Sequence, residues 1–436
     1  MLAFSLRGRG SANVARSTRW ARGSSPTQLY ATLLGLKAPC EITDVEMKQP
    51  PGEVHIRVAL PADTLWVCPQ CSSAAPIHDH QERHWRHLDT CQFPTIVHAR
   101  VPRLKCPTHG IKQLPVPWAE VGSRFTAMFE ALAISWLGHA SIKAVAAQFR
   151  LSWAEVDGIL QRAVRRGLAR RKLEAPRHVG VDETSFQKRH EYVTVVSDLD
   201  RGIVVHVADD RGREALDGFW TSLPAGQRDR VEAVAMDMWQ PYIQSTLAHL
   251  PGAAGKIVFD KFHVAQHLGN AVDLVRRQEH RARMAEGDAI LKGTKYRWLE
   301  SRQGRDWSEA RAFTLLREIV VRVGRAWSLR EAAMALWRLT YPAVADRNFR
   351  RWYRWARSSQ LEPMRKVAAM IERHWANIRT YFTHRITSAG AESLNARIQS
   401  AKRRACGFRN RDRFRTAIYF HCGGLDLYPA LASSGA

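Results

Sequence analysis

The stretch from residue 178 to 268 alternates apolar runs with helical patterns, and this order most restricts how the chain can fold. Three strand-like runs come first, "HVGVDETSF", "EYVTVVSDL" and "GIVVHVADD", the last two spaced as a hairpin. A helical stretch "GREALDGFWTSL", a strand "VEAVAMD", a helix "QPYIQSTLAHL" and a strand "KIVFD" that enters another helix follow. The predicted order is βββαβαβα, which indicates a sheet covered by helices.

This order is that of the ribonuclease H-like fold, in which the first strand is central and the fourth pairs beside it. We therefore expect an α/β catalytic core with a mixed five-stranded sheet over residues 176–422. A helical insertion, at about 270–378, is rich in Arg and Trp. Such helices suit a packed bundle whose outer face follows a phosphate backbone or stacks on bases.

Two aspartates fall at matching places in this pattern. Asp182 lies in the first strand and Asp237 ends the fourth. We expect both side chains at the same end of neighbouring strands, where they repel unless a cation joins them. Two Mg²⁺ ions about 3.5 to 4 Å apart, with Mn²⁺ able to replace them, would take such carboxylates and a third one as ligands. An aspartate that ends a strand is also a common turn former.

Glu392 is the candidate for the third carboxylate, because it is the one acid between Arg373 and Arg411. Residues 388–405 have helical periodicity. One predicted face is polar and the other is buried; the polar face holds Glu392, Asn395, Gln399 and Lys402, and the buried face holds Leu394, Ile398, Ala401 and Ala405. A helix lying across the sheet would bring Glu392 to the two aspartates.

Asp260, in "VFDKFH", is the competing third ligand because it also ends a predicted strand. Together with His263 it could instead support the site, as could Asn395. Glu183 is expected on the opposite face of its strand from Asp182, because side chains alternate along a strand.

Two short knuckles, "CPQC" and "CPTH", offer soft ligands at i and i+3. Cys68, Cys71, Cys106 and His109 suit a closed tetrahedral zinc site, hence a structural one, in a small β-rich unit over residues 35–115. Cys91 and His87 are possible substitute ligands, and free buried thiols beside a surface histidine are the alternative. The seven cysteines, an odd number, do not indicate a disulfide framework.

Residues 123–172 have helical periodicity, within a predicted DNA-binding domain over residues 116–175. The segments "SIKAVAAQF" from Ser141 and "SWAEVDGILQRAV" from Ser152 are separated by a tight turn at Arg150. Ser152 and Glu155 form a capping-box pattern. This is typical of a helix-turn-helix, although an ordinary helical hairpin would look similar. The residues predicted to contact DNA are Ser152, Trp153, Arg162, Arg165, Arg166, Arg397, Lys402, Arg403 and Arg404.

The net charge of +25 favours a polyanionic partner, with nucleic acid as the first choice. No apolar run approaches the roughly 18 residues needed for a membrane span, so no membrane partner is expected. Residues 1–34 form a basic arm that we expect to be disordered, and residues 423–436 a frayed tail.

These motifs together resemble the ISL-three family of bacterial insertion-sequence transposases, a group of DDE enzymes. The matching blocks are "GVDETSFQKRHEYVTVVSDL", "VAMDMWQPY", "IVFDKFHVAQHL", "LKGTKYRWL" and "ITSAGAESLNARIQSAKRRACGFRNRDRFR", in the family's order, and the likeness runs from about residue 35 to 422. It departs from the family at His109, where a cysteine is more usual.

The resemblance implies that Asp182, Asp237 and Glu392 are the catalytic triad. It also implies binding of double-stranded DNA at terminal inverted repeats, cleavage and strand transfer of cut-and-paste type, and a homodimer or larger assembly on paired ends. We expect a cytoplasmic, nucleoid-associated bacterial protein. Two rival hypotheses remain, a catalytically silent DNA-binding regulator and a metal-dependent nuclease without strand transfer.

Overall fold

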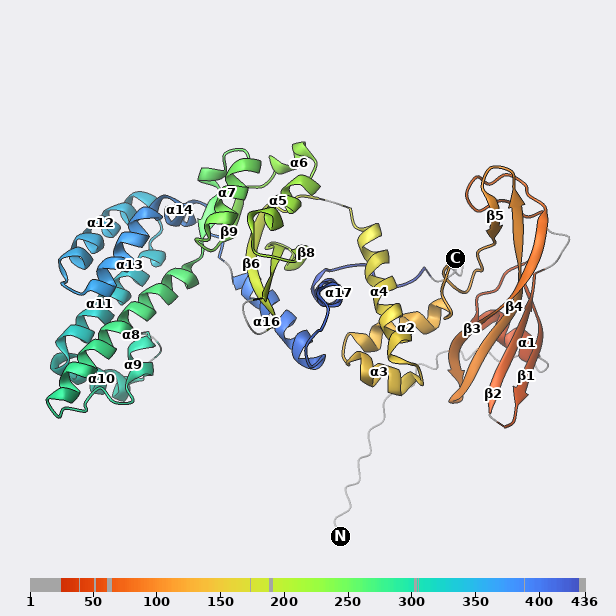
Figure 1. Ribbon diagram of the computed structural model, residues 1–436, viewed down its shortest axis with the longest axis horizontal. Coiled ribbons are helices and arrows are strands. Elements are labelled where there is room, and N and C mark those ends of the chain that lie inside the picture. Colours follow the sequence, from red (N-terminus) through yellow and green to blue (C-terminus); the bar gives the residue numbers. More distant parts are fainter. Residues whose placement is uncertain are drawn as a thin grey trace, which may run out of the picture. The chain divides into compact units, whose positions relative to one another are not determined.

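The computed structural model describes residues 25–430 apart from 39, 51, 61–64, 173, 188–190, 302–303, 305 and 388. The chain forms two compact units (Figure 1). Of the described residues, one unit comprises those from 25 to 136 together with 428–430, and the other comprises those from 137 to 427. Within the described residues, no helix is both long enough and apolar enough to cross a membrane.

The first unit is built on a five-stranded sheet. Its strands are β1 (Glu41–Lys48), β2 (Glu53–Ala59), β3 (Ile77–Thr90), β4 (Phe93–Cys106) and β5 (Gly110–Gln113), ordered β1-β2-β4-β3 with β5 beside β4. Ile56, Trp85, Val97 and Leu104 are buried in its core, and the rings of Trp85 and Trp118 meet edge to face at 5.3 Å. The expectation of a small β-rich unit is confirmed.

A helix, α1 (Pro26–Leu33), precedes this sheet and corrects the prediction of a disordered arm over residues 1–34. Ser25 caps it, its proline occupies the first turn, and its Tyr30 is buried with the hydroxyl 2.7 Å from Thr90 Oγ1. The burial of Tyr30 and Leu34 in the core holds this segment in place. The predicted arm residues 1–24 lie outside the described part of the chain.

The helix-turn-helix pair is α3 (Ile142–Phe149) and α4 (Trp153–Arg170), preceded by α2 (Ala127–Leu137). Ser141 caps α3, and Ser152 and Glu155 form the predicted capping box at the start of α4. Arg150 ends α3 in the left-handed conformation, with φ 55° and ψ 43°, at the position where a glycine is more usual. The two helices and their tight turn are as predicted.

The second unit contains the predicted mixed sheet. Its strands are β6 (His178–Gln187), β7 (Glu191–Asp198), β8 (Ile203–Ala208), β9 (Ala233–Met236) and β10 (Ile257–Phe259), in the order β10-β9-β6-β7-β8. β9 and β10 run parallel to β6, and β7 and β8 complete an antiparallel meander. Helices α5 (Arg213–Ser222), α6 (Ala225–Arg228) and α7 (Gln240–His249) lie between β8 and β10 in sequence, with a short 3₁₀ turn at Ala253–Gly255.

Between β10 and the last two helices the chain is helical, as the insertion was predicted to be. Its helices are α8 (Lys261–Ala285), α9 (Lys295–Leu299), α10 (Trp307–Ile319), α11 (Val321–Ala335), a 3₁₀ turn Leu336–Arg338, α12 (Pro342–Ser358), α13 (Glu362–Arg373), α14 (Trp375–Arg379) and α15 (Tyr381–His384). Buried tryptophans at 298, 327, 337 and 352 form much of its core. Thr380 Oγ1 donates to the Ile257 carbonyl at 2.6 Å and so ties the insertion to β10.

The chain closes with α16 (Ala389–Arg404) and α17 (Arg411–Cys422). Leu394, Ile398 and Ala401 are buried as predicted, whereas Ala405 is exposed. That prediction was wrong because the helix ends at Arg404 and the backbone turns through positive φ at Cys406 and Gly407.

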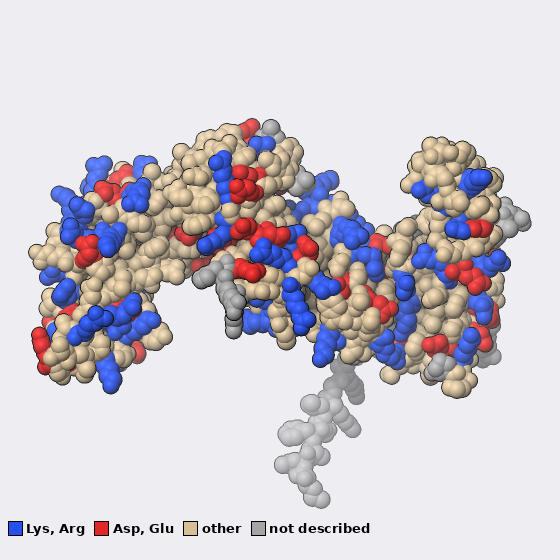
Figure 2. Space-filling view, in the orientation of Figure 1, with Lys and Arg blue, Asp and Glu red and all other residues tan. Residues whose placement is uncertain are grey.

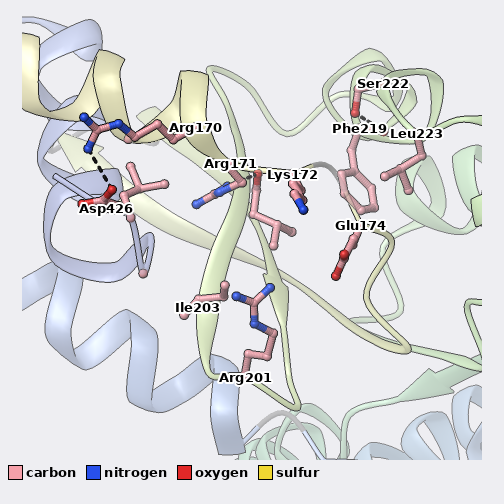
Figure 3. Close-up of a pocket in the computed structure, with 14 residues that line it drawn as sticks. Arg170, Arg171, Lys172, Glu174, Arg201, Ile203, Phe219, Ser222, Leu223 and Asp426 are labelled. Carbon is pink, nitrogen blue, oxygen red and sulfur yellow. Dashed lines mark hydrogen bonds and ion pairs between the residues drawn. The ribbon is translucent and has the colours of Figure 1, made fainter. Parts of the chain in front are cut away.

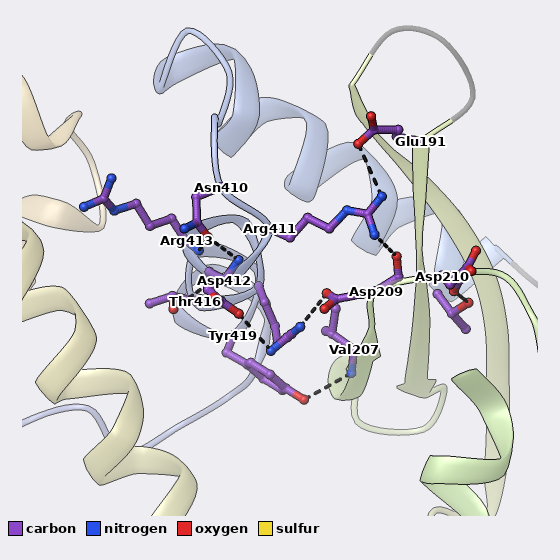
Figure 4. A network of polar contacts seen from close by, with 12 residues as sticks. Glu191, Val207, Asp209, Asp210, Asn410, Arg411, Asp412, Arg413, Thr416 and Tyr419 are labelled. Carbon is purple, nitrogen blue, oxygen red and sulfur yellow. Dashed lines mark hydrogen bonds and ion pairs between the residues drawn. The ribbon is translucent and has the colours of Figure 1, made fainter. Parts of the chain in front are cut away.

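Helix α17 is held to the sheet by a network of polar contacts (Figure 4). Tyr419 accepts the backbone N–H of Val207 at 3.1 Å, and Arg411 donates to the Asp209 carbonyl at 3.0 Å. On the other side, Arg413 pairs with the buried Asp157 of α4 at 3.3 Å. Helix α17 therefore connects the helix-turn-helix to the sheet.

The segment after α17 was predicted to be a frayed tail, and its first part is not. Leu425 packs against Gly167 of α4, where a Cβ would come within 2.7 Å of the leucine Cβ. Asp426 pairs with Arg170 at 2.8 Å, and Arg171 donates to the Gly423 carbonyl at 2.6 Å beside a pocket (Figure 3). The tail prediction is therefore wrong for residues 423–427, and residues 431–436 lie outside the described chain.

Candidate active site

Three aspartates lie on three neighbouring strands: Asp182 within β6, and Asp237 and Asp260 directly after β9 and β10. In the parallel pair β6 and β9, Gly180 is paired with Ala235, so the register continued by two residues sets Asp182 opposite Asp237. In the pair β9 and β10, Phe259 is paired with Met236, so the next residues, Asp260 and Asp237, are also opposite. The placement predicted for Asp182 and Asp237 thus follows from the observed strand pairing.

Asp182 is held by donors on both carboxylate oxygens. Its Oδ1 accepts the backbone N–H of Glu183 at 2.7 Å, and its Oδ2 accepts a hydrogen bond from Asn395 Nδ2 at 2.7 Å. Burial raises the pKa of Asp182, against the lowering effects of the Glu183 N–H and the His263 charge, and the charges of Asp260 and Asp237 add to the rise. Because the charged form of Asp182 is disfavoured here, a nearby cation would stabilise it.

His263 lies between the other two aspartates. Its Nδ1 is 3.1 Å from Asp260 Oδ2 and its Nε2 is 3.8 Å from Asp237 Oδ2. The hydrogen bond to Asp260 raises the pKa of His263 to about 9, with the charges of Asp237, Asp260 and Asp182 adding to the rise against desolvation. The three aspartates thus favour the protonated form of His263, whose positive charge offsets part of their negative charge.

Asp260 has a structural role of its own. It caps α8, accepting the Phe262 N–H at 3.1 Å, and its side chain is buried. Since its second oxygen accepts from His263, both of its oxygens are engaged within the protein. These contacts fix the start of α8 and orient His263, so Asp260 has a structural role at this edge of the sheet.

Helix α16 docks along β6 through the polar row predicted for it. Asn395 donates to Asp182, Gln399 Nε2 donates to Thr184 Oγ1 at 2.7 Å, and Lys402 Nζ donates to the Ser185 carbonyl at 2.7 Å. The row therefore follows the strand, with Asn395 at the end nearest the aspartates.

Glu392 lies one turn before Asn395, in the first turn of α16. Its side chain is exposed, and its pKa is raised first by partial desolvation and then by the charge of Asp260, against His263. The glutamate therefore lies within electrostatic range of the aspartate cluster. The carboxylate oxygens of Asp182, Asp237, Asp260 and Glu392 do not form one tight cluster. Among the described residues, the only such cluster of ligand atoms is the cysteine-rich one described below.

Glu183, next to Asp182, has different partners. It pairs with Arg211 at 3.7 Å and shares a hydrogen bond with Tyr242 of α7. Glu183 therefore lies on the face of β6 opposite to the face that α16 covers, as predicted.

Cys68, Cys71, Cys106 and His109 come together in the first unit, with their ligand atoms all within 4.8 Å of one another. His109 Nδ1 lies 3.8 Å from Cys68 Sγ and 3.6 Å from Cys106 Sγ, and Cys71 Sγ lies 3.7 Å from Cys106 Sγ. These distances match the roughly 3.8 Å between ligands of a tetrahedral site with zinc–sulfur bonds of about 2.3 Å. Donors from Ser73 lower the pKa of Cys71 to about 6, which favours a thiolate ligand.

The two substitute ligands do not join this cluster. Cys91 is exposed in the turn between β3 and β4, and His87 is buried with its Nδ1 2.9 Å from Thr126 Oγ1. Neither belongs to the group of ligand atoms.

The residues predicted to contact DNA fall into two groups. Arg166, Arg397, Lys402 and Arg404 donate to backbone carbonyls, at Leu427, His421, Ser185 and Gly138 respectively. Arg165 and Arg403 are exposed, Arg162 is partly exposed, Ser152 caps α4, and Trp153 is 42% exposed with the Arg413 guanidinium 4.6 Å from its ring. The first group thus stabilises the fold whatever its role toward DNA, which stays a prediction.

Comparison with protein families decides what kind of protein this is. Residues 179–418 match a family model described as "Transposase", of the DDE type and ISL3 family. The chain belongs to the ISL3 family of transposases. Residues 64–109 match the zinc-finger of transposase IS204/IS1001/IS1096/IS1165, and residues 114–164 match the helix-turn-helix domain of transposase family ISL3.

Curated relatives agree with this assignment. The transposase for insertion sequence element IS1001 of Bordetella parapertussis is 27% identical over 380 residues, covering 85% of this chain and 92% of that protein. The transposase for insertion sequence element IS1557 of Mycobacterium tuberculosis is 26% identical over 415 residues, covering 88% of this chain and 92% of that protein. The protein is therefore a DDE transposase, an enzyme of DNA cleavage and strand transfer, with DNA-binding and zinc-finger domains that imply DNA as partner.

Sequence reasoning missed the acceptors on β6. Thr184 Oγ1 accepts a hydrogen bond from Gln399, and the Ser185 carbonyl accepts one from Lys402. The sequence predicted that the two donors share the polar face of a helix, but it did not predict these acceptors. The signal was available, because residues at i+2 from Asp182 share its face of the strand.

Proposed function

We propose that Asp182, Asp237 and Glu392 are the metal-binding carboxylates of this transposase, with Mg²⁺ as the natural ion and Mn²⁺ able to replace it. The proposal rests on two contacts at the same edge of the sheet, the pairing of β6 with β9 and the docking of α16 on β6. The strand register sets Asp182 opposite Asp237, and Asn395, one turn after Glu392 on the polar row of α16, donates to Asp182 at 2.7 Å. Hard carboxylate oxygens are the donors that such ions prefer.

Each residue then has a defined task. The carboxylates of Asp182, Asp237 and Glu392 would hold the divalent ions, which would supply activation of the attacking oxygen and stabilisation of the leaving 3′-oxygen. Asn395 and the Glu183 N–H orient the Asp182 carboxylate. Asp260 orients His263, whose imidazolium balances the carboxylates and so limits their mutual repulsion.

We further propose that the enzyme cuts at terminal inverted repeats and transfers the freed ends to target DNA by cut and paste. In the first step a water oxygen bonds to phosphorus, the bond to the 3′-oxygen breaks, and the 3′-hydroxyl is released. That hydroxyl then attacks a target phosphodiester, exchanging one phosphorus–oxygen bond for another. Paired ends call for a dimer or a larger assembly, acting on the bacterial nucleoid in the cytoplasm.

Cys68, Cys71, Cys106 and His109 would hold a structural zinc ion in the same protein. The match of residues 64–109 to the family's zinc-finger supports this assignment, as does the spacing of the four ligand atoms. With all four positions filled by protein ligands, this site leaves none open for substrate.

The test is a cleavage and joining assay in Mg²⁺ on DNA carrying the element's own ends. Variants Asp182→Asn, Asp237→Asn and Glu392→Gln should bind this DNA but neither cut nor join it, while the unchanged protein does both. Binding without cutting by the unchanged protein would indicate a regulator, and cutting without joining would indicate a nuclease. Retention of cleavage in any of the three variants would contradict the assignment of that residue.

A further inference from the structure

Helix α12 carries two opposite stripes of side chains. Ala345, Phe349, Trp352 and Ala356 are buried against the rest of the insertion. On the other side, five exposed arginines recur at three- and four-residue steps, and we name them the α12 arginine stripe: Arg347, Arg350, Arg351, Arg354 and Arg357. Because such steps return to the same side of a helix, the five guanidinium groups share one face.

The positive charge of the stripe is not neutralised within the described chain. None of its arginines forms an ion pair or hydrogen bond there, although many other arginines do. The nearby acids are already engaged, since Asp346 accepts from Trp375 Nε1 and Arg379 Nε, both at 2.9 Å, and Glu372 accepts from Tyr353. An exposed cationic row without acidic partners is unusual for a surface that is merely solvated.

Two members of the stripe also line a groove beside α14. Arg350 and Arg354 face it together with Arg373 and Arg379, and its walls include the rings of Tyr353 and Trp375. The Trp375 ring is fixed by stacking on Phe349 at 3.8 Å. Figure 2 shows Lys and Arg side chains gathered over the region of α12 and α13. The groove is also lined by Asp346, which pairs with Arg379, and by Glu372, which accepts from Tyr353, so the stripe arginines Arg350 and Arg354, unpaired within the described chain, lie beside a fixed aromatic wall.

We propose that this α12 surface binds the phosphate backbone of double-stranded DNA outside the terminal repeats, independently of base sequence; this rests on the proposed function. The stripe extends about 15 Å along the helix, at 1.5 Å per residue, and so spans several phosphates of a duplex. Guanidinium groups donate in pairs to phosphate oxygens. The stripe itself contains only donors, which suits contacts to the backbone rather than reading of base edges.

The charge of α13 provides a matched control. Arg365 and Lys366 of α13 also lie in the insertion but pair with Glu362, at 3.6 and 4.0 Å. The double variants Arg350→Gln with Arg354→Gln, and Arg365→Gln with Lys366→Gln, remove the same charge from the same bundle. Because the four side chains are exposed, both proteins should fold, which equal thermal unfolding would verify.

Affinity for a 40-base-pair duplex without the repeats would be measured by fluorescence anisotropy, with no divalent ion added, over a salt series. The α12 variant should bind at least about tenfold more weakly near 0.15 M salt. The slope of log affinity against log salt concentration should decrease in magnitude by about 2, since each phosphate contact contributes roughly 0.9 to it. The α13 variant should stay within about twofold of the unchanged protein. Replacing Arg350 and Arg354 by lysine should keep most of the affinity.

Equal affinity of the two double variants, or an unchanged salt slope, would overturn the proposal. The result does not depend on the catalytic residues, because binding is measured without cleavage. Failure of the triad would instead appear as cleavage by the Asp182→Asn or Glu392→Gln protein. The two hypotheses can therefore fail separately.

Discussion

Asn395→Ala tests whether docking of α16 on β6 serves catalysis as well as folding. The variant loses the 2.7 Å hydrogen bond to Asp182 Oδ2, and a bond to a charged acceptor contributes about 1.5 to 3 kcal/mol. If the whole of this free energy stabilises the transition state by positioning the Asp182 carboxylate, its loss lowers the cleavage rate by about 10- to 150-fold, at roughly 1.4 kcal/mol per factor of ten.

Gln399→Ala is the matched control, because it removes a 2.7 Å bond from the next turn of the same row to the neutral hydroxyl of Thr184. It should cost about 1 kcal/mol of stability and change the rate far less. The assay is single-turnover cleavage at saturating protein, with thermal unfolding of each variant alongside. Equal rate losses in the two variants would refute the reasoning, as would an unchanged rate in Asn395→Ala.

Three other predictions follow from local contacts. Burial and neighbouring arginines lower the pKa of His421 from 6.5 to about 4. The stability linked to this shift, at most about 3.4 kcal/mol, is complete above pH 6.5 and is lost as the pH falls toward 4. The free energy of unfolding of His421→Asn, measured in urea, should therefore depend less on pH over that range. Metal analysis should find one zinc per chain, lost in Cys71→Ser and kept in Cys91→Ser; equal zinc content in both would exclude the cluster as its site. Gly167→Ala should lower stability by about 1 to 3 kcal/mol because its Cβ meets Leu425, whereas Gly158→Ala in the same helix, whose nearest contact is 3.5 Å away, should be neutral or stabilising; equal melting temperatures would contradict the observed packing.

Hydrophobic periodicity was sufficient to predict the catalytic sheet. Strands β9 and β10 are short, wholly buried apolar runs, and each is followed directly by its aspartate. The strand order then followed from general topology, and the pairing of Gly180 with Ala235 confirms it. These features were predictable because they depend on local patterns and on one general rule of chain order.

Features that depend on distant contacts were not predictable in the same way. Strand β3 is long, but its sequence "IHDHQERHWRHLDT" is polar, because most of its side chains are only partly buried or exposed. Docking of residues 423–427 depends on the space left by Gly167, which no local pattern reveals. Helix α1 was hidden for the same reason, because its Tyr30 is ordered by a partner sixty residues away.

The competition between Glu392 and Asp260 also illustrates this limit. Both are acids in the right region, and only the structure reveals that Asp260 caps α8 and bonds to His263. The polar row of α16 could be predicted from helical spacing, but its acceptors on β6 could not.

The most direct test of the carboxylate triad is a count of Mn²⁺ ions bound by the DNA-bound transposase, measured by electron paramagnetic resonance. The unchanged protein and Asp260→Asn should each bind two ions per active site, while Glu392→Gln should bind at most one. Two tightly bound ions in Glu392→Gln, or their loss in Asp260→Asn alone, would contradict the account.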